Sequence, residues 1–175
     1  GKFPPTWKAE PQADQRAAAI ERWKKASGPF SPFQVMESDG RRVQLEKSRV
    51  LPLWHGTRKE LCESVAQTGF TYFGKVALDG SATGSTDEGY FGSGMYFTNS
   101  ARYSADIYSS GHLLLSWVSM REPFPVVHDG AVPLCSDMQT LRGKGAYKDY
   151  NAHYVPVTAN PPVPSNPYYY PCKVG

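Results

Sequence analysis

A glycine- and aromatic-rich stretch, residues 89–104, limits how this chain can fold more than any other feature. It reads GYFGSGMYFTNSARYS and contains three glycines, three tyrosines and two phenylalanines. Glycine lets another group approach the backbone closely, and neighbouring aromatic rings offer flat faces to that group. The approaching group is either another strand or a ligand, and the stretch taken alone favours packing within a sheet.

Size and composition predict one globular domain. A chain of 175 residues with 40% hydrophobic residues can bury a core without disulfides or metals. No apolar run approaches the roughly 18 residues that a membrane helix needs. The net charge of +3, without a Lys/Arg run, gives no strong signal for nucleic acid. The cysteines lack metal-ligand spacing, so we expect no metal site and a reducing compartment, cytoplasm or nucleus; they are Cys62, Cys135 and Cys172.

The first third of the chain predicts a helix and three strands. Apolar residues recur every three or four positions before a Gly-Pro pair, which is typical of a helix that ends there. Apolar–polar alternation on both sides of Asp39-Gly40 predicts a hairpin. The predicted elements are a helix over 13–26 (apolar at Ala13, Ala17, Ile20 and Trp23), hairpin strands 33–38 and 41–45, and a strand over 50–54 that ends at His55.

A second helix is predicted directly after that strand. Thr57 and Glu60 have the spacing of a capping box, in which each side chain bonds a free backbone N–H group. Leu61 and Val65 would then face inward, and Gly69 would end the helix.

The rest of the chain mixes strands and helices without strict βαβ alternation, which predicts an α+β fold with antiparallel pairs. We expect one domain over 1–175, with a helical segment at 1–30 and an extended Pro/Tyr-rich tail at 156–175. The remaining expectations are a loop over 71–88, a strand over 94–97, a helix from Asn99 or Ser100 to about Tyr108, a central strand over 112–120, an edge strand over 151–154, and little regular structure after Pro123.

Three motifs in order resemble the catalytic domain of poly(ADP-ribose) polymerase-like ADP-ribosyltransferases. They are HGT at 55–57, GYFGSGMYFT at 89–98 and ARYS at 101–104, followed by the apolar strand. HGT alone would be a weak signal, but the motifs at this spacing are a strong one. The resemblance covers roughly residues 45–155 and implies split antiparallel sheets flanked by helices.

The resemblance also implies an activity. Such enzymes bind NAD, break its nicotinamide–ribose bond through an oxocarbenium-like transition state, and transfer ADP-ribose to an acceptor. We therefore expect an NAD-dependent ADP-ribosyltransferase without a metal, whose partners are NAD or nicotinamide-like ligands and a protein acceptor.

Site residues follow from the motifs. The resemblance gives His55 the adenosine-side ribose, for which a neutral imidazole suffices, and gives Gly56 the nicotinamide amide. Tyr96 would stack on the nicotinamide ring, Ser104 would bond the amide oxygen, and Tyr108 would close the other face of the ring. His55 and Tyr96 are the expected catalytic residues; Thr57, Gly94 and Phe97 complete the expected NAD-binding set, and Gly92 and Gly94 would let the strand approach the cofactor.

One expected element is missing, because the chain has no Glu after Glu122. In the family a late-strand Glu orients the nicotinamide ribose and stabilises the developing cation. Either the domain is truncated after Gly175, or His153 replaces the Glu, a change that goes with single transfer or no activity. The alternatives to an enzyme are a non-catalytic NAD- or ADP-ribose-binding module and an interaction domain whose aromatics only pack.

Overall fold

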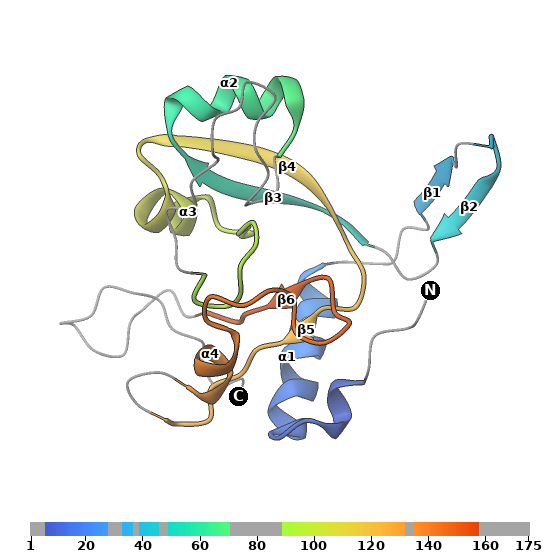
Figure 1. Cartoon of the computed structure of the whole chain (residues 1–175), viewed down its shortest axis with the longest axis vertical. Coiled ribbons are helices and arrows are strands. Elements are labelled where there is room, and N and C mark those ends of the chain that lie inside the picture. The colour runs from blue at the N-terminus through green and yellow to red at the C-terminus, as the bar shows by residue number, and fades with distance from the viewer. Residues whose placement is uncertain are drawn as a thin grey trace.

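The computed structural model is a small mixed α/β protein (Figure 1). It describes residues 6–27, 33–36, 39–45, 49–70, 89–131 and 135–157. The predicted loop at 71–88 and the tail from residue 158 onward lie outside these residues. No helix in the described ranges is long and apolar enough to cross a membrane.

The strands pair in twos, β1 with β2, β3 with β4, and β5 with β6. The helices are η1 (Trp7–Ala9), α1 (Ala13–Ala26), α2 (Lys59–Thr68), α3 (Ala101–Tyr108) and α4 (Ser136–Leu141). The strands are β1 (Phe33–Met36), β2 (Arg42–Leu45), β3 (Arg49–Thr57), β4 (His112–Met120), β5 (Phe124–Pro125) and β6 (His153–Tyr154).

The β3–β4 pair is the longest of the three strand pairs described, and β3 carries His55. The two strands run antiparallel over their whole length, with His55 opposite Leu114 and Gly56 opposite Leu113. Helices α2 and α3 flank this pair in Figure 1. The predicted strands over 50–54 and 112–120 and the hairpin β1–β2 are therefore confirmed.

The predicted strand over 94–97 is wrong. Its place is taken by an irregular segment that meets β3 at one antiparallel bridge, where Trp54 and Thr98 exchange N–H to O bonds of 2.7 and 2.9 Å. The carbonyl of Tyr96 lies 2.8 Å from the ring of His55. The side chain of His55 therefore bonds a backbone carbonyl that a longer strand pairing with β3 would need.

The predicted capping box is also wrong. Thr57 is the last residue of β3 and is buried, so α2 begins one residue later with Arg58 as an N-cap that makes no side-chain bond. Leu61 does not face inward, because 42% of its surface is exposed. Gly69 ends α2 as predicted, with φ of 77°.

Helix α1 has the predicted bounds, and two of its four predicted apolar positions, Ile20 and Trp23, are buried as expected. Its buried residues are Arg16, Ala19, Ile20 and Trp23, whereas Ala13 and Ala17 are only half-buried. Arg16 can belong to the buried face because Asp137 neutralises its guanidinium. Helix α3 was predicted correctly, and the Ser100 hydroxyl caps it by accepting from the Tyr103 N–H at 3.2 Å.

The second half of the chain is more regular than predicted. Helix α4 was not expected, and β6 pairs with β5 in parallel rather than forming part of an antiparallel sheet. Residues between 124 and 150 supply all but Phe91 of the main hydrophobic core, whose buried residues are Phe91, Phe124, Val126, Cys135, Met138, Leu141 and Tyr150.

Candidate functional site

His55 stands near the end of β3, where its ring is fixed by backbone and aromatic neighbours. Its Nδ1 lies 2.8 Å from the carbonyl oxygen of Tyr96. A carbonyl can only accept, so Nδ1 carries the hydrogen and Nε2 of the neutral ring is an acceptor. The rings of Phe70 and Phe97 lie 5.1 and 5.4 Å from the imidazole. The structure thus presents His55 with one defined acceptor nitrogen.

Tyr96 is held at both ends. Its hydroxyl accepts from the Phe91 N–H at 3.0 Å and donates to the Gly92 carbonyl at 2.7 Å. Its backbone carbonyl accepts from His55. The hydroxyl of Tyr96 is thus bonded to a turn of its own chain.

The ring face of Tyr96 lies against Tyr108. The two ring centroids are 6.1 Å apart and the planes differ by 25°. Tyr103 adds an edge contact to Tyr108, at 5.8 Å and 76°. The structure therefore brings the predicted stacking residue and the predicted second face together, and adds Tyr103, which the sequence did not single out.

Helix α3 positions two of the predicted residues. Ser104 and Tyr108 are four residues apart and so lie on one face of the helix. Ser104 is almost fully buried, at 1% exposure. The same face lies against β3 at Gly56, where an added Cβ would come within 2.7 Å of the Ser104 carbonyl oxygen and 2.8 Å of the Tyr108 carbonyl carbon. Close helix packing is therefore one reason for glycine at position 56.

The other predicted binding residues are spread more widely. Phe97 packs with His55 and with Phe70, in an aromatic cluster separate from the Tyr96–Tyr108 pair. The carbonyl of Thr57 accepts from the Ser110 N–H at 3.2 Å. A Cβ on Gly94 would meet no atom within 4 Å, so packing inside the chain does not require glycine there.

His153 lies beside the turn that holds Tyr96. Its Nδ1 is 2.6 Å from the Phe91 carbonyl oxygen, and its Nε2 accepts from the Tyr147 N–H at 3.0 Å. A Cβ on Gly92, which has φ of 108°, would come within 3.0 Å of the His153 ring. Burial lowers the pKa of His153 below its usual value. Both ring nitrogens are therefore engaged with the backbone.

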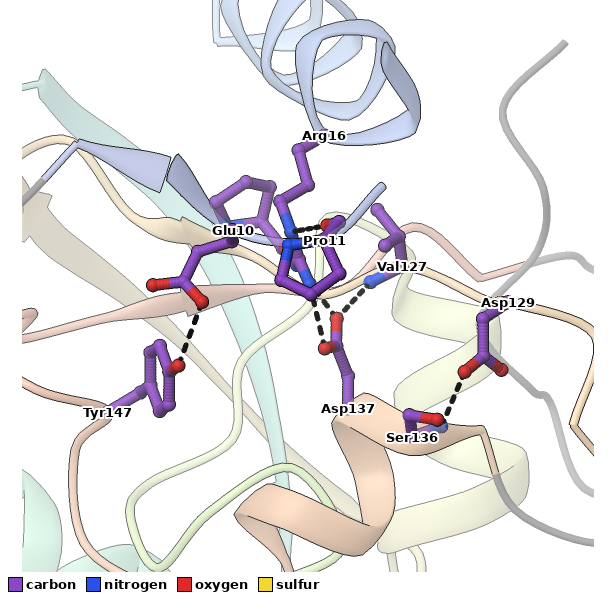
Figure 2. A network of polar contacts seen from close by, with 9 residues as sticks. Glu10, Pro11, Arg16, Val127, Asp129, Ser136, Asp137 and Tyr147 are labelled. Carbon is purple, nitrogen blue, oxygen red and sulfur yellow. Dashed lines mark hydrogen bonds and ion pairs between the residues drawn. The ribbon is translucent and has the colours of Figure 1, made fainter. Parts of the chain in front are cut away.

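A cavity of about 280 Å³ lies in a different part of the molecule. Figure 2 shows the polar network at its wall, centred on the buried Arg16. Arg16 donates to both carboxylate oxygens of Asp137 at 2.8 and 2.9 Å and to the Pro125 carbonyl at 2.5 Å. Asp137 also accepts from the Val127 N–H at 2.8 Å. None of the predicted site residues, all of which are described, lines this cavity.

The remaining carboxylates of the cavity are also bonded. Glu10 accepts from the Tyr147 hydroxyl at 3.0 Å and from Lys148, and the bond from Lys148 lowers the pKa of Glu10. Hydrogen bonds from Ser136 and Ala131 lower the pKa of Asp129 to about 2. The sequence analysis missed this network, because its partners lie far apart in the chain.

Comparisons with protein-family models, curated proteins and solved structures found no match to this chain. Among the residues that the structure describes, no group of three or more His, Cys, Asp or Glu side chains could hold a metal ion.

Proposed function

We propose that this chain is an NAD-dependent ADP-ribosyltransferase that transfers ADP-ribose to a protein acceptor and has an ADP-ribosyltransferase-like arrangement of its sheets. The observation that carries the proposal is the stacked pair of Tyr96 and Tyr108 rings, together with His55 on the backbone carbonyl of Tyr96. The nicotinamide ring of NAD can stack on an aromatic pair, and a ribose hydroxyl of NAD can donate to a histidine.

The aromatic pair would have to open to hold a third ring between its members. A ring held between two others needs about 7 Å between the outer rings, twice a contact distance of about 3.5 Å. The Tyr96–Tyr108 centroids are 6.1 Å apart. Tyr108, the last residue of α3, would have to move outward to admit a nicotinamide ring, while Tyr96 stays fixed by its hydroxyl bonds to the turn.

His55 offers the ligand a hydrogen bond in which the imidazole is the acceptor. Its Nε2 is an acceptor because Nδ1 carries the hydrogen that faces the Tyr96 carbonyl. A ribose hydroxyl can donate to that nitrogen. We assign His55 to the adenosine-side ribose, and Tyr96 and Tyr108 to the nicotinamide.

In the proposed reaction, the bond between the nicotinamide nitrogen and C1 of its ribose breaks, and nicotinamide leaves with the electron pair. An acceptor side chain forms a bond to C1 and releases a proton. Positive charge develops on the ribose, and a nearby carboxylate would stabilise it. The sequence has no Glu after Glu122, and both nitrogens of His153 are engaged with the backbone.

The state of His153 favours a second candidate, a module that binds NAD or ADP-ribose without turnover. A neutral imidazole whose nitrogens are occupied would stabilise a cation poorly. We therefore expect this chain to bind NAD or ADP-ribose, and to transfer single ADP-ribose units slowly or not at all.

Binding is tested by titrating the protein with nicotinamide and with a fluorescent NAD analogue. Tyr96→Ala and Tyr108→Ala each remove one stacking face, and each should weaken binding by about 1–3 kcal/mol, by analogy with base–aromatic stacking. Trp117→Ala is the control, because Trp117 is an aromatic residue on β4 that is 76% exposed and lies outside the turn that holds Tyr96. A lowered melting temperature with unchanged affinity would assign Tyr96 to packing alone.

His55→Asn separates the two ends of NAD, because the asparagine amide can still donate to the Tyr96 carbonyl while the Nε2 acceptor is removed. Loss of its hydrogen bond should weaken NAD by about 1–3 kcal/mol, while nicotinamide, which has no adenosine ribose, should bind as before. Equal losses for both ligands would refute the assigned role. Incorporation of labelled ADP-ribose into protein then distinguishes the enzyme from the binding module.

A further inference from the structure

The turn of residues 89–92 is the element that joins the proposed ligand site to the C-terminal part of the chain. Gly92 N–H donates to the Gly89 carbonyl at 3.0 Å and closes the turn. The Tyr96 hydroxyl bonds the turn twice, at Phe91 N–H and at the Gly92 carbonyl. Any shift of the turn therefore moves the ring of Tyr96.

His153 holds the other side of the same turn. The Phe91 carbonyl can only accept, so Nδ1 of His153 must be its donor at 2.6 Å. The Tyr147 N–H can only donate, so Nε2 of His153 must be unprotonated to accept it at 3.0 Å. The contacts thus require one tautomer of the neutral ring, and a second proton on Nε2 would face the Tyr147 N–H.

We infer that His153 is a positioning residue for the proposed ligand site, which in its neutral form holds the 89–92 turn and thereby the ring of Tyr96 in place. The inference rests on the proposed function for the nature of the ligand. It makes nicotinamide binding sensitive to acid through a residue that does not touch the ligand.

The surroundings of His153 set the pH at which this happens. Burial lowers its pKa, and the charge of Asp137 and the Phe91 carbonyl offset this only in part. Asp137 is itself paired with Arg16. Protonation is therefore expected below the ordinary histidine value of 6.5. The other titratable groups in the segments around His153, residues 89–96, 122–127 and 144–154, are Tyr90, Tyr96, Glu122, Lys144, Tyr147, Lys148, Asp149, Tyr150 and Tyr154.

A ligand-free NMR titration tests the inference without any variant. Histidine ¹⁵N correlation should show His153 with its hydrogen on Nδ1 at pH 8. The Phe91 and Tyr147 amides and the Tyr96 ring signals should shift with the midpoint of His153 protonation. The opposite tautomer of His153 would overturn the inference, and so would protonation of His153 without a change in the Tyr96 ring signals. Neither outcome depends on whether a ligand binds.

Binding supplies the second readout. Nicotinamide should bind the wild-type protein about three- to ten-fold more weakly below the His153 midpoint than at pH 8, the value of one lost hydrogen bond. His153→Gln offers one amide donor and one acceptor and does not titrate, so this dependence should disappear. His128→Gln, the control, should keep it. A wild-type affinity that is constant through the midpoint would overturn the inference, whereas absence of nicotinamide binding at every pH would refute the proposed function alone.

Discussion

Substitution of Gly56 by alanine tests how closely α3 must approach β3. A Cβ at this position would lie 2.7, 2.8 and 2.9 Å from backbone atoms of Ser104 and Tyr108. Ordinary contacts between such atoms are about 3.5–4.0 Å, so helix and strand must separate by about 0.6–1.3 Å. β3 is paired with β4 along its whole length. The movement therefore falls on α3, and carries Tyr108 away from its position beside Tyr96.

The expected cost follows from this overlap. Added methyl groups in a packed interior destabilise by about 1–3 kcal/mol. For a chain of this size, each kcal/mol lowers the melting temperature by about 2–4 °C, so Gly56→Ala should lower it by roughly 2–12 °C. The backbone atoms involved cannot rotate away as a flexible side chain could, which favours the upper part of that range.

Urea denaturation followed by circular dichroism measures the effect. Gly94→Ala is the matched control, because its Cβ would meet no atom within 4 Å and no left-handed φ is required there. That variant should stay within about 0.5 kcal/mol of the wild type or gain up to about 1 kcal/mol from a less flexible unfolded chain. Equal stability of the two variants would refute the packing argument for Gly56.

Three further predictions use the same denaturation assay. Arg16→Met leaves the carboxylate of Asp137 without its partner and should cost about 3–5 kcal/mol. The double variant Arg16→Met/Asp137→Leu should recover part of this, and a single variant as stable as the wild type would contradict the prediction. Ser100→Ala removes the cap of α3 and should cost about 1 kcal/mol, whereas Ser119→Ala on the exposed side of β4 should cost little. Asp129 has a pKa lowered from 3.8 to about 2 in the folded protein, so its contribution to stability is present above about pH 3.8 and is lost as the pH falls toward 2. Asp129→Asn should therefore lose less stability than the wild type between pH 5 and 2, and parallel pH profiles would show that Asp129 contributes nothing.

Elements with strong local signals could be predicted from the sequence. The helical period before Gly28-Pro29, the Asp39-Gly40 turn and the apolar run of β4 each act within a few residues. The six residues of α4 and the two-residue strands β5 and β6 carry too short a pattern. They are fixed by contacts between distant residues, such as the parallel pairing of Phe124 with His153.

The candidate site likewise combines features that local sequence patterns predict with features that depend on contacts between distant residues. Ser104 and Tyr108 were expected on one helix, and the structure places Tyr108 beside Tyr96. The hydroxyl bonds of Tyr96 and the two bonds of His153 depend on the path of the backbone through a turn with a left-handed glycine at position 92. The buried pair of Arg16 and Asp137 joins residues 121 positions apart, and no local pattern predicts such a partner.

Nuclear Overhauser effects between nicotinamide and tyrosine ring protons test the central claim most directly. With tyrosine-labelled protein and nicotinamide in excess, we expect contacts from the ligand ring to both Tyr96 and Tyr108, on opposite faces. In the variant Tyr108→Ala, the ligand contacts to residue 108 should be lost, while those to Tyr96 remain. Saturable binding with contacts to neither ring, or no binding by the folded protein, would contradict the account.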